Sequence, residues 1–159
     1  MSRFTLLIAL TVAFLVPQGL AAQPTAKDKT PPPLTRILFV FDGSQSMFGR
    51  WESGPKIDVA QRLIGQMLDS LQTIQGEGNF QLALRVYGHQ RPVPPQDCSD
   101  TRLEVPFGMH NIPRIKKVLR AIQPKGTTPI AQSLMASADD FPPCDRARVY
   151  PVLIPSAPR

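Results

Sequence analysis

The chain has 159 residues, 42 % of them apolar, which suits an ordinary globular protein with one domain and a real core. Its formal net charge of +6 permits binding to an anionic surface, but lysine and arginine are scattered. The densest basic group has helical spacing and is better explained as a solvated helix face, so we expect no nucleic-acid partner. That group consists of Arg114, Lys116, Lys117 and Arg120.

The first 22 residues have the anatomy of a secretory signal peptide, with a basic Arg3, an apolar run of 13 residues and small residues up to Ala22. A membrane-spanning helix needs about 20 apolar residues, so a cleaved signal is favoured over an uncleaved anchor. No stable membrane span is expected after cleavage. We therefore expect an exported protein, whether periplasmic, on the cell surface or secreted.

Residues 23–33 contain four prolines and no apolar periodicity, which predicts an extended linker before a domain over 34–159. In that domain, an unbroken apolar run predicts a strand over 36–41, buried on both faces. Helical spacing predicts a helix over 56–74, and alternation predicts a strand over 80–87. Residues 102–107 are typical of a short edge strand, with Pro106 ending its pairing.

A second helix is predicted over 112–122, and a third begins at Thr128 and Pro129, where the Thr128 hydroxyl would cap the first turn. The last predicted strand, 148–154, contains Pro151, which should remove a hydrogen bond from a central strand. This order predicts an α/β fold with a mainly parallel sheet. The expected buried face of the third helix is formed by Ile130, Leu134, Met135, Ala138 and Phe141.

Cys98 and Cys144 are the two cysteines, and both lie in loops rich in proline and aspartate. Export would bring them into an oxidising compartment, where a disulfide between them could contribute about 2–4 kcal/mol. Two unpaired thiols, or pairing with another chain, remain open.

Asp42, Ser44 and Ser46 directly follow the first predicted strand. Ligands of open α/β sheets bind beyond the carboxyl ends of the strands, where these side chains should lie. One carboxylate and two hydroxyls are hard oxygen donors that suit Mg²⁺ or Ca²⁺ better than zinc. Because hydroxyls are neutral, a bound cation would keep positive charge and attract an Asp or Glu carboxylate of a protein partner.

The stretch FVFDGSQSM, residues 39–47, resembles the DxSxS motif of von Willebrand factor type A (VWA) domains. GTTPIAQSL, residues 126–134, resembles the later loop that carries the threonine ligand of that family. The resemblance covers about residues 34–154 and implies a Rossmann-like sheet flanked by helices, a metal-ion-dependent adhesion site, a protein-binding role and no enzymatic activity. It implies that Ser44, Ser46 and Thr128 offer oxygens to Mg²⁺, Ca²⁺ or Mn²⁺, with Asp42 orienting the site directly or through water.

The chain departs from that family at its end, where Pro155 and Ser156 stand in place of a further threonine and acid. With one anionic ligand missing, we expect weak cation binding. The departure also predicts a VWA domain that is incomplete at the C-terminus, by frameshift or as a gene fragment. A non-functional or weakly folded remnant is therefore an alternative reading.

A hydrolase using Mg²⁺ and Asp42 as nucleophile is a less favoured alternative. Hydrolases that resemble the haloacid dehalogenase group carry a second Asp two residues on, where this chain has Ser44.

Arg50 and Trp51 follow the motif and are candidate partner contacts, although Trp51 could equally pack under the first helix. His89 and His110 lack the spacing of paired metal ligands and are predicted to be surface-loop residues. A solvated acidic loop is predicted near Cys98, with a calcium contact as its alternative. That loop contains Asp97, Asp100 and Glu104.

Overall fold

The computed structural model describes residues 33–74, 79–143 and 147–156. The predicted signal peptide, nearly all of the predicted linker and Cys144 lie outside the described residues. Cys98 is described and is exposed, and its predicted disulfide with Cys144 stays a prediction. Within the described ranges, no helix combines the length and the apolar character needed to cross a membrane.

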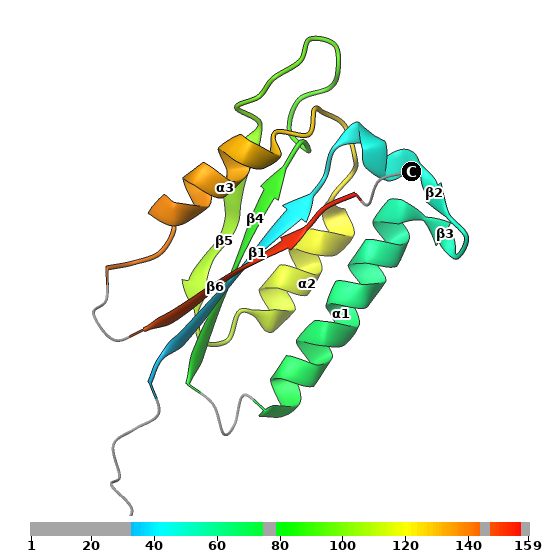
Figure 1. Cartoon of the computed structure of the whole chain (residues 1–159). Helices are drawn as coiled ribbons and strands as arrows, with labels where there is room; N and C mark the ends of the chain where they lie inside the picture. The colour runs from blue at the N-terminus through cyan, green and yellow to red at the C-terminus, as the bar shows by residue number, and fades with distance from the viewer. Residues whose placement is uncertain (1–32, 75–78, 144–146, 157–159) are drawn as a thin grey trace, which may run out of the picture. The chain divides into compact units, whose positions relative to one another are not determined.

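Four strands form one mixed sheet in the order β5-β4-β1-β6 (Figure 1). They are β1 (Thr35–Asp42), β4 (Phe80–Tyr87), β5 (Thr101–Gly108) and β6 (Arg148–Ile154). β1 pairs in parallel with both β4 and β6, and β5 runs antiparallel to β4. The prediction of an α/β fold with a mainly parallel sheet is confirmed.

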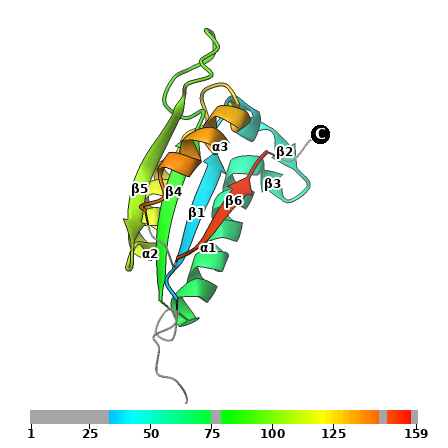
Figure 2. The same ribbon diagram turned by 60° about the vertical axis from the view of Figure 1, so that its left-hand side comes forward.

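Two helices, α1 (Lys56–Ile74) and α2 (Ile112–Ala121), cover one face of the sheet, and α3 (Ile130–Asp139) lies on the other (Figures 1 and 2). Phe39 and Phe41 pack into the core beneath α1 and α2. Leu38 and Val40 point to the opposite face, toward Ile130 at the start of α3. Helices on both faces explain why β1 is an unbroken apolar run rather than an alternating one.

The short segment of structure between β1 and α1 was not predicted from the sequence. It consists of the 3₁₀ helix η1 (Gln45–Phe48) and an antiparallel pair, β2 (Arg50–Trp51) and β3 (Gly54–Pro55). Trp51 is half-buried, with the Lys56 Nζ atom 5.8 Å from the centroid of its ring, whereas Arg50 is exposed. Their role as partner contacts stays a prediction.

Neither strand proline acts as the sequence suggested. β5 continues past Pro106 to Gly108, which pairs with Leu82 across a local irregularity in register. In β6, Arg148 donates its N–H to the Leu34 carbonyl at 2.9 Å, so alternate residues from Arg148 onward face β1. Pro151 therefore faces the open edge and removes no hydrogen bond from the β1 ladder, as is usual for proline in an edge strand.

The expected buried face of α3 is right at its ends and wrong between them: Ile130 and Phe141 pack against the sheet core, whereas Leu134, Met135 and Ala138 are exposed. Leu134 and Met135 are 40 % and 69 % exposed, while Ser133 and Ser137 are buried against the sheet. The two serine hydroxyls donate to carbonyls of their own helix, from Ser133 to Pro129 at 2.7 Å and from Ser137 to Ser133 at 2.6 Å. Because these hydroxyls are satisfied, small serines can be buried at low cost and let α3 approach the sheet closely.

Candidate functional site

Four hydroxyl groups meet beyond the carboxyl end of β1. The Thr128 Oγ1 atom donates to Ser44 Oγ at 2.9 Å, and Ser44 Oγ lies 2.8 Å from Ser46 Oγ. Ser46 Oγ in turn donates to Ser156 Oγ at 2.9 Å. We call Ser44, Ser46, Thr128 and Ser156 the hydroxyl cluster. Its members come from three separate segments of the chain, so the fold brings together the three hydroxyls that the sequence singled out and adds a fourth.

Asp42 forms the base of the hydroxyl cluster and has no exposed surface. Its Oδ1 atom accepts the Ser44 N–H at 2.7 Å, and its Oδ2 atom accepts the Ser156 N–H at 3.0 Å. Each carboxylate oxygen thus holds the backbone of one segment that carries a cluster hydroxyl. This arrangement makes Asp42 a residue that orients the cluster.

Access to the cluster is graded from the interior to the surface. Ser44 is buried, Ser156 is half-buried, and Ser46 and Thr128 are exposed. A small ion could therefore reach the oxygens from solvent. Hydroxyl oxygens are a ligand type that hard cations accept. The only carboxylate at the cluster is that of Asp42, and both of its oxygens already accept N–H groups. The donor set fits Mg²⁺ or a similar ion held weakly.

No other grouping in the described ranges competes for such an ion, because no three His, Cys, Asp or Glu side chains there lie close enough together to hold a metal.

Tyr87 stands beside Asp42 on the neighbouring strand, paired with it in register. Its hydroxyl is buried and has no hydrogen-bond partner among the described residues. Burial and then the negative charge of Asp42 raise the pKa of Tyr87 far above its usual value, so the phenol stays neutral. Tyr87 could not be identified from the sequence as a neighbour of Asp42, because that proximity depends on how β1 and β4 pair.

Two glycines let the three segments approach one another. Gly88 has a φ of +68°, and a Cβ atom there would lie 2.2 Å from the Thr127 carbonyl oxygen and 2.8 Å from Ser44 Cα. The Gly126 N–H donates to the Gly88 carbonyl at 2.7 Å, and the Gln45 N–H donates to the Gly126 carbonyl at 2.9 Å. These backbone bonds fix the Thr128 loop against the end of β1.

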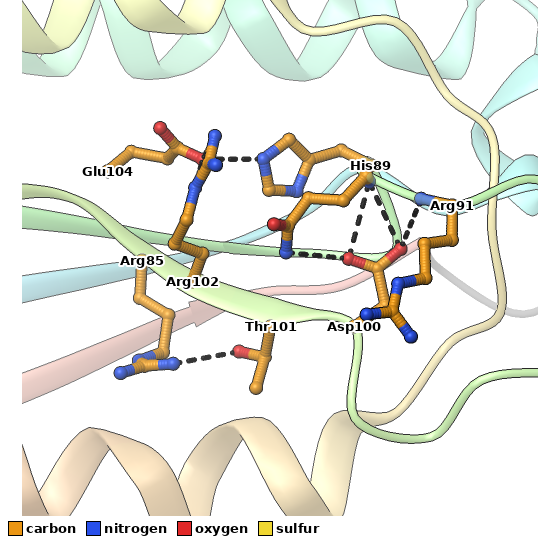
Figure 3. Close-up of polar contacts among 8 residues, drawn as sticks. Arg85, His89, Arg91, Asp100, Thr101, Arg102 and Glu104 are labelled. Carbon is orange, nitrogen blue, oxygen red and sulfur yellow. Dashed lines mark hydrogen bonds and ion pairs between the residues drawn. The ribbon is translucent and has the colours of Figure 1, made fainter.

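Asp100 holds the loop that contains Gly88, as Figure 3 shows for its carboxylate. It is 2 % exposed and accepts the Arg91 N–H at 3.0 Å, the Gln90 N–H at 3.1 Å and the Gln90 side-chain amide at 2.9 Å. Its own carbonyl accepts the Gly88 N–H at 2.8 Å. The prediction of a solvated acidic loop is wrong for Asp100, which is a buried clamp on residues 88–91.

The other two acids of that predicted loop also have partners. Burial alone would raise the pKa of Glu104, but hydrogen bonds from Arg102 and His89, each 2.6 Å long, hold it below its usual value (Figure 3). Hydrogen bonds from Ser99, aided by Arg91, lower the pKa of Asp97. Both side chains are thus engaged with neighbouring residues rather than freely solvated.

Of the two histidines expected in surface loops, only His110 is exposed. The side chain of His89 is 10 % exposed and pairs with Glu104. Neither this pairing nor the contribution of Ser156 to the cluster was predicted from the sequence, because both depend on which strands become neighbours.

No protein-family model matches the chain, and no curated protein matches it. Among solved structures, it is similar to the PilB minor pilin from Streptococcus sanguinis, with a TM-score of 0.54 and 18 % identity over 76 % of this chain and 29 % of that one. It is also similar to three N-terminal domains of the type V pili tip protein Mfa5 from Porphyromonas gingivalis, with a TM-score of 0.53 and 16 % identity over 76 % of this chain and 19 % of that one.

The separately solved vWF domain of Mfa5 aligns with a TM-score of 0.46 at 17 % identity, over 74 % of this chain and 36 % of that one. The fold likeness therefore rests on the two higher-scoring structures. At these identities it is a likeness of fold alone, and this chain spans less than a third of the length of either of those two.

Proposed function

We propose that this chain is an exported, non-enzymatic binding module of the VWA type that holds a divalent cation in the hydroxyl cluster and binds a protein partner through it. One observation carries the proposal: Thr128 Oγ1 lies 2.9 Å from Ser44 Oγ although 84 residues separate them in sequence. An ordinary helix cap would leave the Thr128 hydroxyl on its own helix. Instead, the start of α3 has no side-chain cap and the hydroxyl faces the end of β1.

In this proposal Ser44, Ser46 and Thr128 offer oxygens to Mg²⁺, Ca²⁺ or Mn²⁺, and Ser156 offers a fourth. Asp42 orients them through the two backbone N–H groups that it accepts. The bound cation supplies positive charge that the neutral hydroxyls do not cancel. An Asp or Glu carboxylate of a protein partner completes its coordination, because hard cations prefer anionic oxygen.

The surface around the cluster suits a protein partner. Phe48, two residues beyond Ser46, is 61 % exposed, and Arg50 is exposed at the start of β2. Aromatic and arginine side chains are enriched at protein interfaces. A minor pilin and a pilus tip protein share the fold, which agrees with a role in attachment at a cell surface.

A hydrolase that uses Asp42 as nucleophile is less well supported. A nucleophilic carboxylate must present an oxygen to the substrate, whereas Asp42 has no exposed surface and both its oxygens accept backbone N–H groups.

The proposal is tested by calorimetric titration of Mg²⁺ into two valine variants and into the chain without its predicted signal peptide, residues 23–159, which we call the mature chain. Thr128→Val removes a cluster hydroxyl and should lower the Mg²⁺ affinity at least about tenfold from a dissociation constant on the order of millimolar. Thr73→Val is the matched control, because Thr73 is exposed near the end of α1 and its hydroxyl donates to the Ser70 carbonyl at 2.7 Å, outside the cluster. It should bind Mg²⁺ like the unmodified chain.

No heat of Mg²⁺ binding at millimolar concentration, or equal affinity in the Thr128→Val variant and the unmodified chain, would contradict the proposal.

A further inference from the structure

A groove of about 370 Å³ opens directly beside the hydroxyl cluster. One side is formed by the loop between β4 and β5, through Val93, Gln96 and Cys98. The other side is formed by Gln45, Ser46 and Thr128, so two members of the cluster line the groove. The groove thus adjoins the proposed cation site and is open to the residues next to a carboxylate bound there.

The groove is uncharged in a chain with a formal charge of +6. None of the described residues that line it is Lys, Arg, Asp or Glu. Gln45 and Gln96 are exposed, and their side-chain amides make no hydrogen bond within the described ranges. Amides can donate to and accept from a peptide backbone, whereas a charged side chain placed there would meet no opposite charge among the described residues that line the groove.

The walls of the groove are held before any ligand binds. Thr127 Oγ1 donates to the Asp97 carbonyl at 2.5 Å, which ties one wall to the other. Asp97 Oδ1 accepts the Ser99 N–H at 2.8 Å, and Asp100 clamps the start of the same loop at Arg91 (Figure 3). A wall that is already ordered costs little entropy when a ligand binds, so it favours recognition.

We infer that this groove selects the protein partner by the residues next to its cation-binding carboxylate, and that those residues are uncharged. This inference rests on the proposed function, because the carboxylate is held by the cation. Within it, Gln96 is a specificity residue, and the occupant is an extended peptide segment in which an acidic residue is flanked by polar or small apolar ones.

The test uses blocked five-residue peptides, Gly-Gln-Asp-Gln-Gly and its versions with Lys or Glu in place of both Gln. Each is titrated by NMR into the isotope-labelled mature chain with saturating Mg²⁺. The Gln-flanked peptide should bind at least about fivefold more tightly than either charged peptide, because the groove lining pairs with its amides but offers no partner to a charge. The shifted amide signals should include Gln96.

Charge substitutions at Gln96 should redirect this preference. Gln96→Glu should bind the Lys-flanked peptide about fivefold more tightly than the unmodified chain does. Gln96→Lys should bind the Glu-flanked peptide more tightly by the same factor. Gln123→Glu is the matched control: Gln123 is exposed and does not line the groove, so the same change in net charge should leave the preference unaltered.

Three results would each contradict the proposed role of the groove without contradicting the cation site. They are equal binding of the three peptides, equal effects of Gln96→Glu and Gln123→Glu, and no peptide binding to a chain that holds Mg²⁺. If the chain binds no Mg²⁺ at all, both the proposed function and the proposed role of the groove are contradicted.

Discussion

Replacing Gly88 with alanine is expected to lower the free energy of unfolding by at least about 3 kcal/mol and to abolish Mg²⁺ binding. The position has a φ of +68°, which L-residues with a side chain rarely adopt, and the new Cβ atom would lie 2.2 Å from the Thr127 carbonyl oxygen. Relief of that contact must push the Thr128 loop away from Ser44. Thermal and denaturant unfolding measure the loss of stability, and calorimetry measures the loss of the ion.

Gly65→Ala is the control for the Gly88 variant. Gly65 lies in α1 with no atom within 4 Å of an added Cβ, and alanine is the better helix former by about 1 kcal/mol. It should raise stability and leave Mg²⁺ binding unchanged. Similar stability of the two alanine variants would contradict the packing around Gly88 described above.

Replacing Ser156 with aspartate is expected to raise the Mg²⁺ affinity at least about tenfold, because the number of charged ligands largely sets affinity for hard cations. Ser156 already reaches the cluster, with its N–H on Asp42 Oδ2 and its Oγ atom 2.9 Å from Ser46 Oγ. Without Mg²⁺ the new carboxylate lies near Asp42 and should lower stability through repulsion; saturating Mg²⁺ should reverse this loss. Calorimetry and thermal unfolding with and without Mg²⁺ measure both effects.

Ser156→Asn separates charge from size in this experiment. Asparagine has nearly the shape of aspartate but no charge, so its Mg²⁺ affinity should stay within about threefold of that of the unmodified chain. If the aspartate and asparagine variants bind Mg²⁺ equally, Ser156 does not lie beside a bound cation.

The regular elements could be predicted from the sequence because each carries its own periodicity. Helix α1 and strands β4 and β6 have the bounds that the pattern predicted, and β1 differs by one residue at each end. The 3₁₀ helix η1 and the β2–β3 pair were not predicted, since they are too short to show a period. The paired strands have only two residues each.

The predictions that failed depended on which elements become neighbours. The apolar stripe of α3 predicted that Leu134 and Met135 would be buried. Ser133 and Ser137 are buried instead, because their hydroxyls form hydrogen bonds within the helix. Pro151 was expected in a central strand, but in the described sheet β6 is an edge strand and the proline faces outward. A single sequence gives residue preferences but not the order of strands in a sheet.

The candidate site was predicted as a motif but not as a structure. Asp42, Ser44, Ser46 and Thr128 could be named because their residue types and positions after a strand and before a helix are informative. Ser156 was missed as a contributor because its contacts with Asp42 and Ser46 depend on the pairing of β6 with β1. Asp100 was missed because its role depends on the backbone of Gln90 and Arg91.

Anomalous diffraction from crystals of the mature chain grown with Mn²⁺ tests the central claim most directly, since Mn²⁺ prefers the same octahedral oxygen ligands as Mg²⁺. We predict one strong peak about 2.0–2.3 Å from the hydroxyl oxygens of Ser44, Ser46 and Thr128. The absence of a peak there, with the three hydroxyls still bonded to one another at a Mn²⁺ concentration of tens of millimolar, would contradict it.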